Sequence, residues 1–217
     1  MSLAAFEGRD VPAGRVGEVL ELWSTPVPGA WMRGSDARVL DPKSRYTRTH
    51  EAEIKGPEHL IEHELLDPLR AQAAATVFGE SLLDGVNAVP LAKDEQGGRA
   101  GNVEADLLLR TASGYYLAEV KSASNYAWYA SVELLRQIKL LLESDAARRI
   151  MSVRAGTPTN YLYGMVLAPS TFYSANGRRA DSVEPSRQLA RKVREAFDVH
   201  FRLAVWNPSA RAVVTLP

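Results

Sequence analysis

The sequence predicts an α/β protein with a mixed central sheet that is covered by helices on both faces. Two strand candidates at residues 103–110 and 115–122 are separated by the turn-forming tetrapeptide TASG. Amphipathic helical patterns at residues 130–149 and 186–197 are each followed by an apolar strand candidate, at residues 160–169 and 202–208. Strands that alternate with helices in this way are typical of a sheet buried between helical layers.

The first 55 residues differ from the rest because prolines and glycines interrupt them repeatedly. Val16, Val19, Leu20 and Trp23 have helical spacing, whereas residues 46–54 favour an extended segment. We therefore expect a small N-terminal subdomain of mixed or β structure over residues 1–55, and an α/β domain over residues 56–217.

The α/β domain is expected to begin with a long helix over residues 58–79. Pro57 suits the first turn of a helix and Gly79 suits its end, while Pro68 is expected to bend or divide it. A short strand within residues 84–101 precedes the two strand candidates of the hairpin. The resulting order is helix, three strands, helix, strand, helix and strand.

The amino-acid composition excludes several classes of protein. The chain has 217 residues and no cysteine, which excludes a disulfide framework and any cysteine-ligated metal. No apolar run reaches the length of a membrane span, and the first residues lack the features of a signal peptide, so we expect a cytoplasmic protein that does not enter a membrane. The total charge is balanced, but residues 50–147 carry 16 acidic and 8 basic side chains, and residues 148–217 carry 4 and 11.

The predicted hairpin carries the most informative residues. A turn centred between Ala112 and Ser113 places Asp106 directly across from Glu119, and Glu104 across from Lys121, with all four side chains on one face. Directly opposed Cβ atoms lie about 5 Å apart, so two carboxylates there repel each other unless a positive charge lies between them. Mg²⁺ fits this position because it prefers oxygen ligands and needs only one or two protein carboxylates. The alternative is an exposed sheet face with a Glu104–Lys121 ion pair.

The aspartate, the ExK element and the helix that follows them resemble the PD-(D/E)XK nuclease superfamily over roughly residues 56–170. The resemblance implies an αβββαβ restriction-endonuclease-like core, Mg²⁺ or Mn²⁺ as cofactor, and phosphodiester hydrolysis in DNA restriction, repair or recombination. It implies that Asp106 and Glu119 bind the metal and that Lys121 orients or deprotonates the attacking water. Gln137 corresponds to a glutamine that some members carry on this helix. Ala105 stands where the superfamily's name has proline.

Many members of the superfamily add a metal-binding glutamate from the helix before the hairpin. Glu62 falls near the middle of the apolar arc of the 58–79 helix, whereas Glu64 falls on the opposite side and is expected to face water. We therefore choose Glu62 as the third ligand and keep Glu58, one turn earlier, in reserve.

The expected partner is nucleic acid, and more specifically DNA. We expect the basic helix at residues 186–197 to hold it. Its cations are Arg187, Arg191, Lys192 and Arg194, and such residues either bind phosphates or form a solvated helix face. The sequence leaves open whether the chain forms a homodimer.

Two other functions remain open at this stage. One is a nuclease-like domain that binds nucleic acid or protein without cleaving it. The other is a zinc-dependent metallopeptidase, because His59, Glu62 and His63 match an H-x-x-E-H pattern in which two histidines one turn apart bind Zn²⁺. This second function needs a further ligand, for which Glu133 is available in the sequence.

Overall fold

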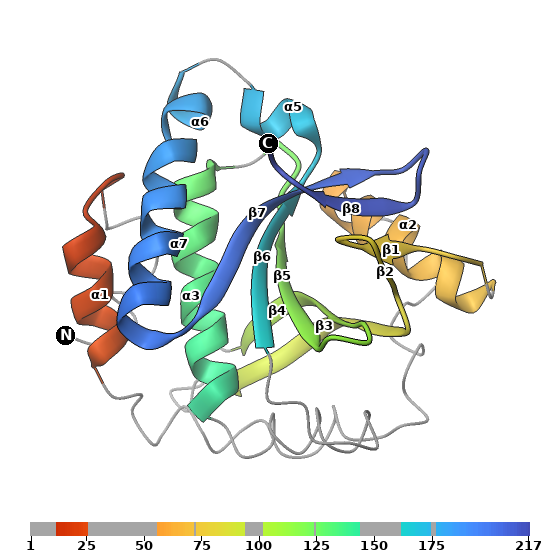
Figure 1. Cartoon of the computed structure of the whole chain (residues 1–217), viewed down its shortest axis with the longest axis horizontal. Coiled ribbons are helices and arrows are strands. Elements are labelled where there is room, and N and C mark those ends of the chain that lie inside the picture. Colours follow the sequence, from red (N-terminus) through yellow and green to blue (C-terminus); the bar gives the residue numbers. More distant parts are fainter. Residues whose placement is uncertain are drawn as a thin grey trace.

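The computed structural model describes residues 12–25, 56–71, 73–93, 102–123, 125–143, 162–174 and 177–217. In these residues, eight strands form one curled, mixed sheet with helices on both faces (Figure 1). The strand order across the sheet is β2-β1-β8-β7-β6-β5-β4-β3. The elements in chain order are α1 (Val16–Ser24), α2 (Pro57–Arg70), β1 (Thr76–Val77), β2 (Glu80–Ser81), β3 (Asp84–Lys93), β4 (Asn102–Arg110), β5 (Tyr115–Val120), α3 (Ala127–Glu143), β6 (Leu162–Ala168), α5 (Ser170–Ser174), α6 (Arg178–Asp181), α7 (Val183–Phe197), β7 (His200–Asn207) and β8 (Ala212–Thr215). The α/β class and the mixed sheet are as the sequence predicts.

The hairpin of β4 and β5 has the predicted register. Four pairs, from Leu107–Ala118 to Arg110–Tyr115, hold the two strands together. The loop between the two strands is closed by a hydrogen bond of 2.9 Å from the Thr111 N–H to the Gly114 carbonyl. The pair farthest from the turn is Leu107–Ala118. The next residues outward are Asp106 and Glu119, so the two strands separate where the acidic residues lie.

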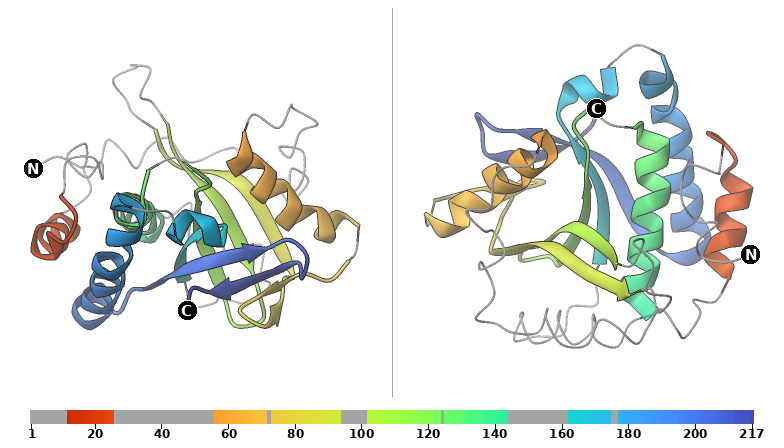
Figure 2. Two further views of the ribbon diagram at one scale, coloured as in Figure 1. Left: turned by 90° about the horizontal axis from the view of Figure 1, so that it is seen from above. Right: turned by 180° about the vertical axis from the view of Figure 1, so that it is seen from behind.

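Strands β5, β6 and β7 run parallel to one another, and every residue of β5 is buried. A parallel strand of this kind is covered on both faces, which explains its nearly continuous apolar sequence. Figure 2 shows α1, α3 and α7 on one side of the sheet and α2 on the other. None of the described helices combines the length and apolar character that a membrane-crossing helix requires.

The helices bury two separate apolar clusters. Leu134, Ile138 and Leu189 belong to the cluster between the sheet and the layer of α1, α3 and α7. Leu65 and Leu66 of α2 pack in the cluster on the opposite face. The site described below contains polar residues from both helical layers.

The prediction of a helix that continues to residue 79 is wrong, because α2 ends at Arg70. Residues 76–77 form β1 instead, which pairs in parallel with β8, and Phe78 and Gly79 make the turn to β2 with φ of 52° and 85°. Two consecutive positive φ angles are typical of a tight hairpin turn. Pairing with a distant strand therefore overrides the helical preference of the preceding alanines.

Helix α1 is the described part of the N-terminal region. Its Val16, Val19 and Trp23 are buried, and α1 packs against α3 and α7. The buried Lys139 of α3 donates to the Trp23 carbonyl. The expected extended segment at residues 46–54 lies outside the described residues.

Gly164 in β6 lies in a tightly packed position. A Cβ atom there would meet Ile138 Cδ1 at 2.6 Å and Phe201 Cβ at 2.9 Å. We expect Gly164→Ala to lower the free energy of unfolding by about 1–3 kcal/mol, because the packed core cannot accept the added methyl group without strain. Gly17→Ala in α1 is the control, since a Cβ atom there meets nothing within 4 Å. Urea titrations measure both variants, and equal stability of Gly164→Ala and wild type would contradict the packing.

Candidate active site

The candidate site lies where β4 and β5 separate. Asp106 comes directly before the last paired residue of β4, and Glu119 comes directly after its partner on β5. The Asp106 Oδ2 accepts a hydrogen bond of 2.6 Å from the Val120 N–H. The main-chain N–H of Val120 thus bonds to the carboxylate of Asp106 and not to a main-chain carbonyl of β4. This hydrogen bond fixes the Asp106 side chain beside β5.

Glu119 is held through both of its carboxylate oxygens. The side-chain ammonium of Lys121 donates to Oε1, and Gln137 Nε2 of α3 donates to Oε2 at 2.5 Å. Glu119 is only 2% exposed. Glu119 and Lys121 both contact side chains of α3, in agreement with the prediction that they share one face of the strand.

Lys121 lies between two carboxylates. Besides its ion pair with Glu119, its Nζ lies 3.4 Å from Glu133 Oε2 of α3. Burial on its own lowers the pKa of Lys121, but the carboxylates of Glu119, Glu133 and Asp106 outweigh this and raise it. Lys121 therefore carries a positive charge at neutral pH. Glu104, which pairs with Lys121 in the alternative of an exposed sheet face, is itself exposed, and its main-chain carbonyl accepts a hydrogen bond from Gln137.

Glu62 reaches the site from α2. It is 5% exposed, and its Oε2 accepts a hydrogen bond of 3.2 Å from Asn87 Nδ2 of β3. Burial raises the pKa of Glu62 to about 7, with the hydrogen bond from Asn87 opposing the shift and the charge of Glu58 adding to it. Glu58, the reserve candidate, accepts a hydrogen bond from the Ser122 N–H.

The carboxylates of the site repel one another. Burial raises the pKa of Asp106 to about 7; the Val120 N–H and Lys121 oppose this, and the charges of Glu62 and Glu133 add to it. Burial, together with Asp106 and Glu133, raises the pKa of Glu119 well above its ordinary value. The group defined by Glu62, Asp106, Glu119, Glu133 and Lys121, hereafter the carboxylate cluster, therefore has four acids against one ammonium.

The donor set of the cluster suits a hard divalent cation. Carboxylate oxygens are the ligands that Mg²⁺ prefers, and one or two of them suffice when water and phosphate complete the coordination. Within the described residues, no three histidine or acidic side chains are placed so that they could hold a metal ion together. Asp106 and Glu119 fit as a two-carboxylate site, and an ion there would relieve the repulsion that raises their pKa values.

Two amide oxygens beside the cluster accept no hydrogen bond from the described residues. They are Gln137 Oε1 and Asn87 Oδ1, and both side chains are more than nine-tenths buried. Buried acceptors without partners are rare and indicate a water molecule or a ligand nearby. Both amides already donate to a carboxylate of the cluster, so their free oxygens lie close to it.

The structure adds two residues that sequence analysis did not connect with this site. Asn87 holds Glu62, and Glu133 pairs with Lys121. Glu133 could have been found, because it precedes Gln137 by one helical turn and residues four apart lie on the same helix face. Asn87 could not, because its partner depends on how α2 packs over β3.

The zinc-peptidase residues do not come together. His59 is exposed and His63 half-buried on α2, whereas Glu62 is buried and bonded to Asn87. Glu133, the sequence candidate for a third ligand, pairs with Lys121.

The prediction that Glu64 faces water is wrong, because it accepts a hydrogen bond of 2.8 Å from Trp206 Nε1.

The basic residues of α7 are largely engaged in local pairs. Arg191 lies 3.1 Å from Glu184, and Lys192 lies 2.8 Å from Glu195. Arg187 donates to the carbonyls of Leu216 and Pro217. Among the interactions of the described residues, none pairs Arg194 with an acid, and its side chain is exposed.

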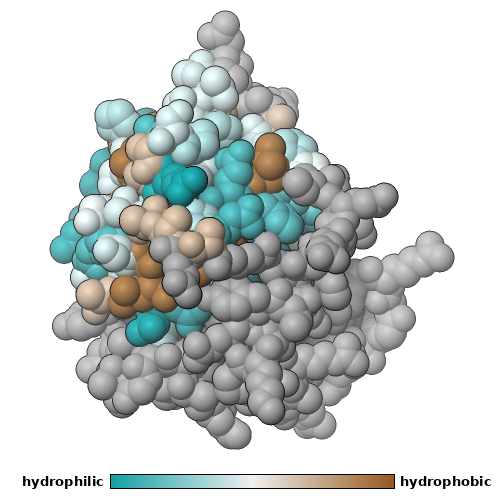
Figure 3. All heavy atoms as spheres, turned by 90° about the vertical axis from the view of Figure 1, so that its right-hand side faces the viewer, coloured by the Kyte–Doolittle hydropathy of each residue, from teal (hydrophilic) through white to brown (hydrophobic). Residues whose placement is uncertain are grey.

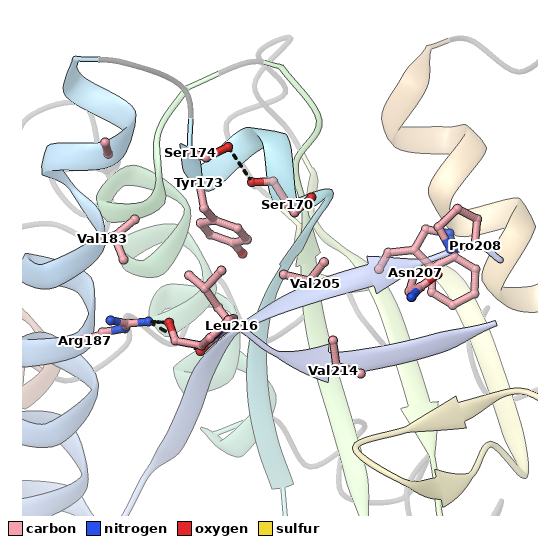
Figure 4. Close-up of a pocket in the computed structure, with 13 residues that line it drawn as sticks. Ser170, Tyr173, Ser174, Val183, Arg187, Val205, Asn207, Pro208, Val214 and Leu216 are labelled. Carbon is pink, nitrogen blue, oxygen red and sulfur yellow. Dashed lines mark hydrogen bonds between the residues drawn. The ribbon is translucent and has the colours of Figure 1, made fainter. Parts of the chain in front are cut away.

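A large hollow lies away from the carboxylate cluster. It has a volume of about 860 Å³ and lies between α5, α7, β7 and β8 (Figure 4). Tyr173, Val183 and Leu216 line it, with Arg187 at one side (Figure 4). The hollow contains no pair of acidic side chains, so we place the site by its chemistry and not by cavity size.

The side of the molecule that carries α2 has no single large apolar surface in its described part. Figure 3 shows hydrophilic residues there with smaller hydrophobic patches between them. Leu60 and Leu83 are among the exposed large apolar side chains. Scattered apolar residues of this kind are normal on protein surfaces and do not indicate a partner.

Comparison of the chain with protein-family models, with curated proteins and with solved structures finds no match. An α/β architecture hosts many unrelated activities, so the fold does not specify one. The function must therefore be inferred from the side chains of the carboxylate cluster.

Proposed function

We propose that this protein is a metal-dependent nuclease that hydrolyses phosphodiester bonds in DNA. The observation that carries the proposal is the placement of the half-buried Asp106 and the buried Glu119 on neighbouring strands, with the ammonium of Lys121 ion-paired to Glu119. Bringing acids that repel one another together away from water costs free energy. Acids perturbed in this way are found most often at functional sites.

The order of elements also supports the proposal. Helix α2, strands β3, β4 and β5, helix α3 and strand β6 come in the order that the PD-(D/E)XK resemblance implies, with the short strands β1 and β2 inserted between α2 and β3. In this proposal Asp106 and Glu119 hold Mg²⁺ or Mn²⁺, and Glu62, the predicted third ligand, is bonded to Asn87. When bound, the ion supplies Lewis-acid polarisation of the phosphate and lowers the pKa of a coordinated water.

The chain's own residues do the remaining work. Lys121 is a charged donor, so it orients the attacking water or stabilises negative charge on the phosphate, and it does not act as a general base. Gln137 keeps Glu119 in place through Oε2. The water oxygen forms a bond to phosphorus, the bond from phosphorus to the leaving sugar oxygen breaks, and the leaving oxygen gains a proton while the water loses one.

Incubation of plasmid and single-stranded DNA with Mg²⁺, Mn²⁺ or EDTA tests the proposal. We expect wild type to cleave DNA with either ion and not in EDTA, and Lys121→Met to cleave about 10²–10³-fold more slowly. Failure of wild type to cleave under any of these conditions would contradict the proposal and leave a non-cleaving binding module. Degradation of casein that a zinc chelator stops would instead support a peptidase.

Arg194 tests whether α7 contacts DNA. We expect Arg194→Ala to weaken binding of a non-cleaving variant to all DNA sequences alike, because a phosphate contact carries no sequence information. A plot of log affinity against log salt should become shallower by about 1. Gln188→Ala, which changes an exposed uncharged residue of the same helix, is the control. An unchanged salt slope for Arg194→Ala would place the DNA elsewhere.

A further inference from the structure

Lys121 has two acidic partners, and only one of them belongs to the predicted metal ligands. Its ammonium is bonded to Glu119 and lies 3.4 Å from Glu133. An ammonium bonded to Glu119 competes with any cation for that carboxylate. Binding of a cation at Glu119 therefore requires Lys121 to shift toward another acceptor.

We propose that Glu133 is a positioning residue that holds the Lys121 ammonium when Glu119 binds a divalent cation. The inference rests on the proposed function and deepens it. Glu133 is the one carboxylate near Lys121, among those that the structure describes, that is both ion-paired with it and outside the predicted ligand set.

The arrangement on α3 supports this division of roles. Glu133 and Gln137 lie one helical turn apart and reach the same strand end. Gln137 holds Oε2 of Glu119, whereas Glu133 contacts only the lysine in this group. Lys121 can thus leave Oε1 of Glu119 without releasing the carboxylate, because Gln137 still fixes the other oxygen.

Charge and burial explain why the second partner is needed. The side chain of Lys121 is only 10% exposed, so solvent cannot replace a lost carboxylate. A buried ammonium without a partner is strongly unfavourable. Without the charge of Glu133, Lys121 stays on Glu119 and opposes binding of the cation.

Gln137 gives a second, independent indication that this place receives a ligand. Its Oε1 is buried beside Glu119 and accepts no hydrogen bond from the described residues. The amide nitrogen of Gln137 donates to two acceptors, Glu119 Oε2 and the Glu104 carbonyl. A water molecule bound at Glu119 would satisfy the free oxygen.

Calorimetric titration of the metal-free protein with MnCl₂ tests the inference without relying on activity. We expect Glu133→Gln to weaken Mn²⁺ binding by about 10–100-fold, the range typical of residues that orient metal ligands. Glu143→Gln is the matched control, because Glu143 also lies on α3 and pairs with a buried lysine, Lys139, at 3.0 Å. This control should bind Mn²⁺ as wild type does. Thermal unfolding in EDTA verifies that each variant is folded.

A double-mutant cycle with Lys121→Met separates positioning from ligation. If Glu133 acts through Lys121, then Glu133→Gln changes Mn²⁺ affinity less than twofold in the Lys121→Met background. An equal loss in both backgrounds would overturn the inference, because Glu133 would then act on the ion directly. Wild-type affinity in Glu133→Gln alone would overturn the inference and leave the nuclease proposal intact. Absence of Mn²⁺ binding by wild type would overturn both.

Discussion

Asp106→Asn is expected to reduce Mg²⁺-dependent DNA cleavage by about a thousandfold. Asparagine keeps an oxygen that can accept the hydrogen bond from Val120, so the local structure is retained while the negative charge is lost. Loss of one charged group that acts on the transition state commonly costs about 10²–10³ in rate, and here the cation loses a ligand as well. Initial rates of plasmid cleavage at saturating Mg²⁺ give the measurement.

Asp84→Asn is the matched control for this variant. Asp84 is a buried carboxylate at the end of a strand, and like Asp106 it accepts a hydrogen bond from a main-chain amide, at 2.9 Å from the Gly85 N–H to its Oδ1. It lies on β3 and is not part of the carboxylate cluster, so we expect its replacement to leave the rate within about twofold of wild type. Equal loss of activity in both variants would mean that Asp106 has a structural role only.

In EDTA, the free energy of unfolding is expected to fall as the pH rises from about 4 to about 7.5. The pKa values of Asp106 and Glu62 are raised to about 7 in the folded protein, from 3.8 and 4.5. The folded state therefore binds more protons than the unfolded state in this range, and stability decreases as these acids ionise. The stabilisation is complete below about pH 4 and lost through pH 7, and together the two groups contribute on the order of a few kcal/mol.

Urea unfolding at several pH values measures this effect, and two comparisons isolate it. Asp106→Asn should flatten the pH dependence and be more stable than wild type above pH 7, because no buried charge forms. Saturating Mg²⁺ should also flatten it, because ions bind the deprotonated carboxylates. The same pH dependence of stability in wild type and in Asp106→Asn would contradict the raised pKa of Asp106.

The hairpin could be predicted from sequence because its signals are local. Alternating apolar residues define both strands, and the turn between them fixes the register that places Asp106 near Glu119. The burial of Glu62 followed from helical periodicity, since the first turns of α2 are helical as expected. Local signals of this kind do not depend on distant parts of the chain.

The errors occur where distant segments meet. The alanines after Arg70 favour a helix, but β1 pairs with β8, about 135 residues later in the chain. Glu64 is half-buried because Trp206 of β7 packs over α2. The ion pair of Lys121 with Glu133, which the sequence does not indicate, likewise depends on how α3 packs against the end of β5.

The most direct test of the proposed metal site is the anomalous difference density of a crystal soaked in MnCl₂. We predict one peak that contacts a carboxylate oxygen of Asp106 and one of Glu119, with the Lys121 ammonium moved from Glu119 toward Glu133. Density at His59 and His63, or no density near Asp106 at Mn²⁺ concentrations that saturate binding in solution, would contradict the account.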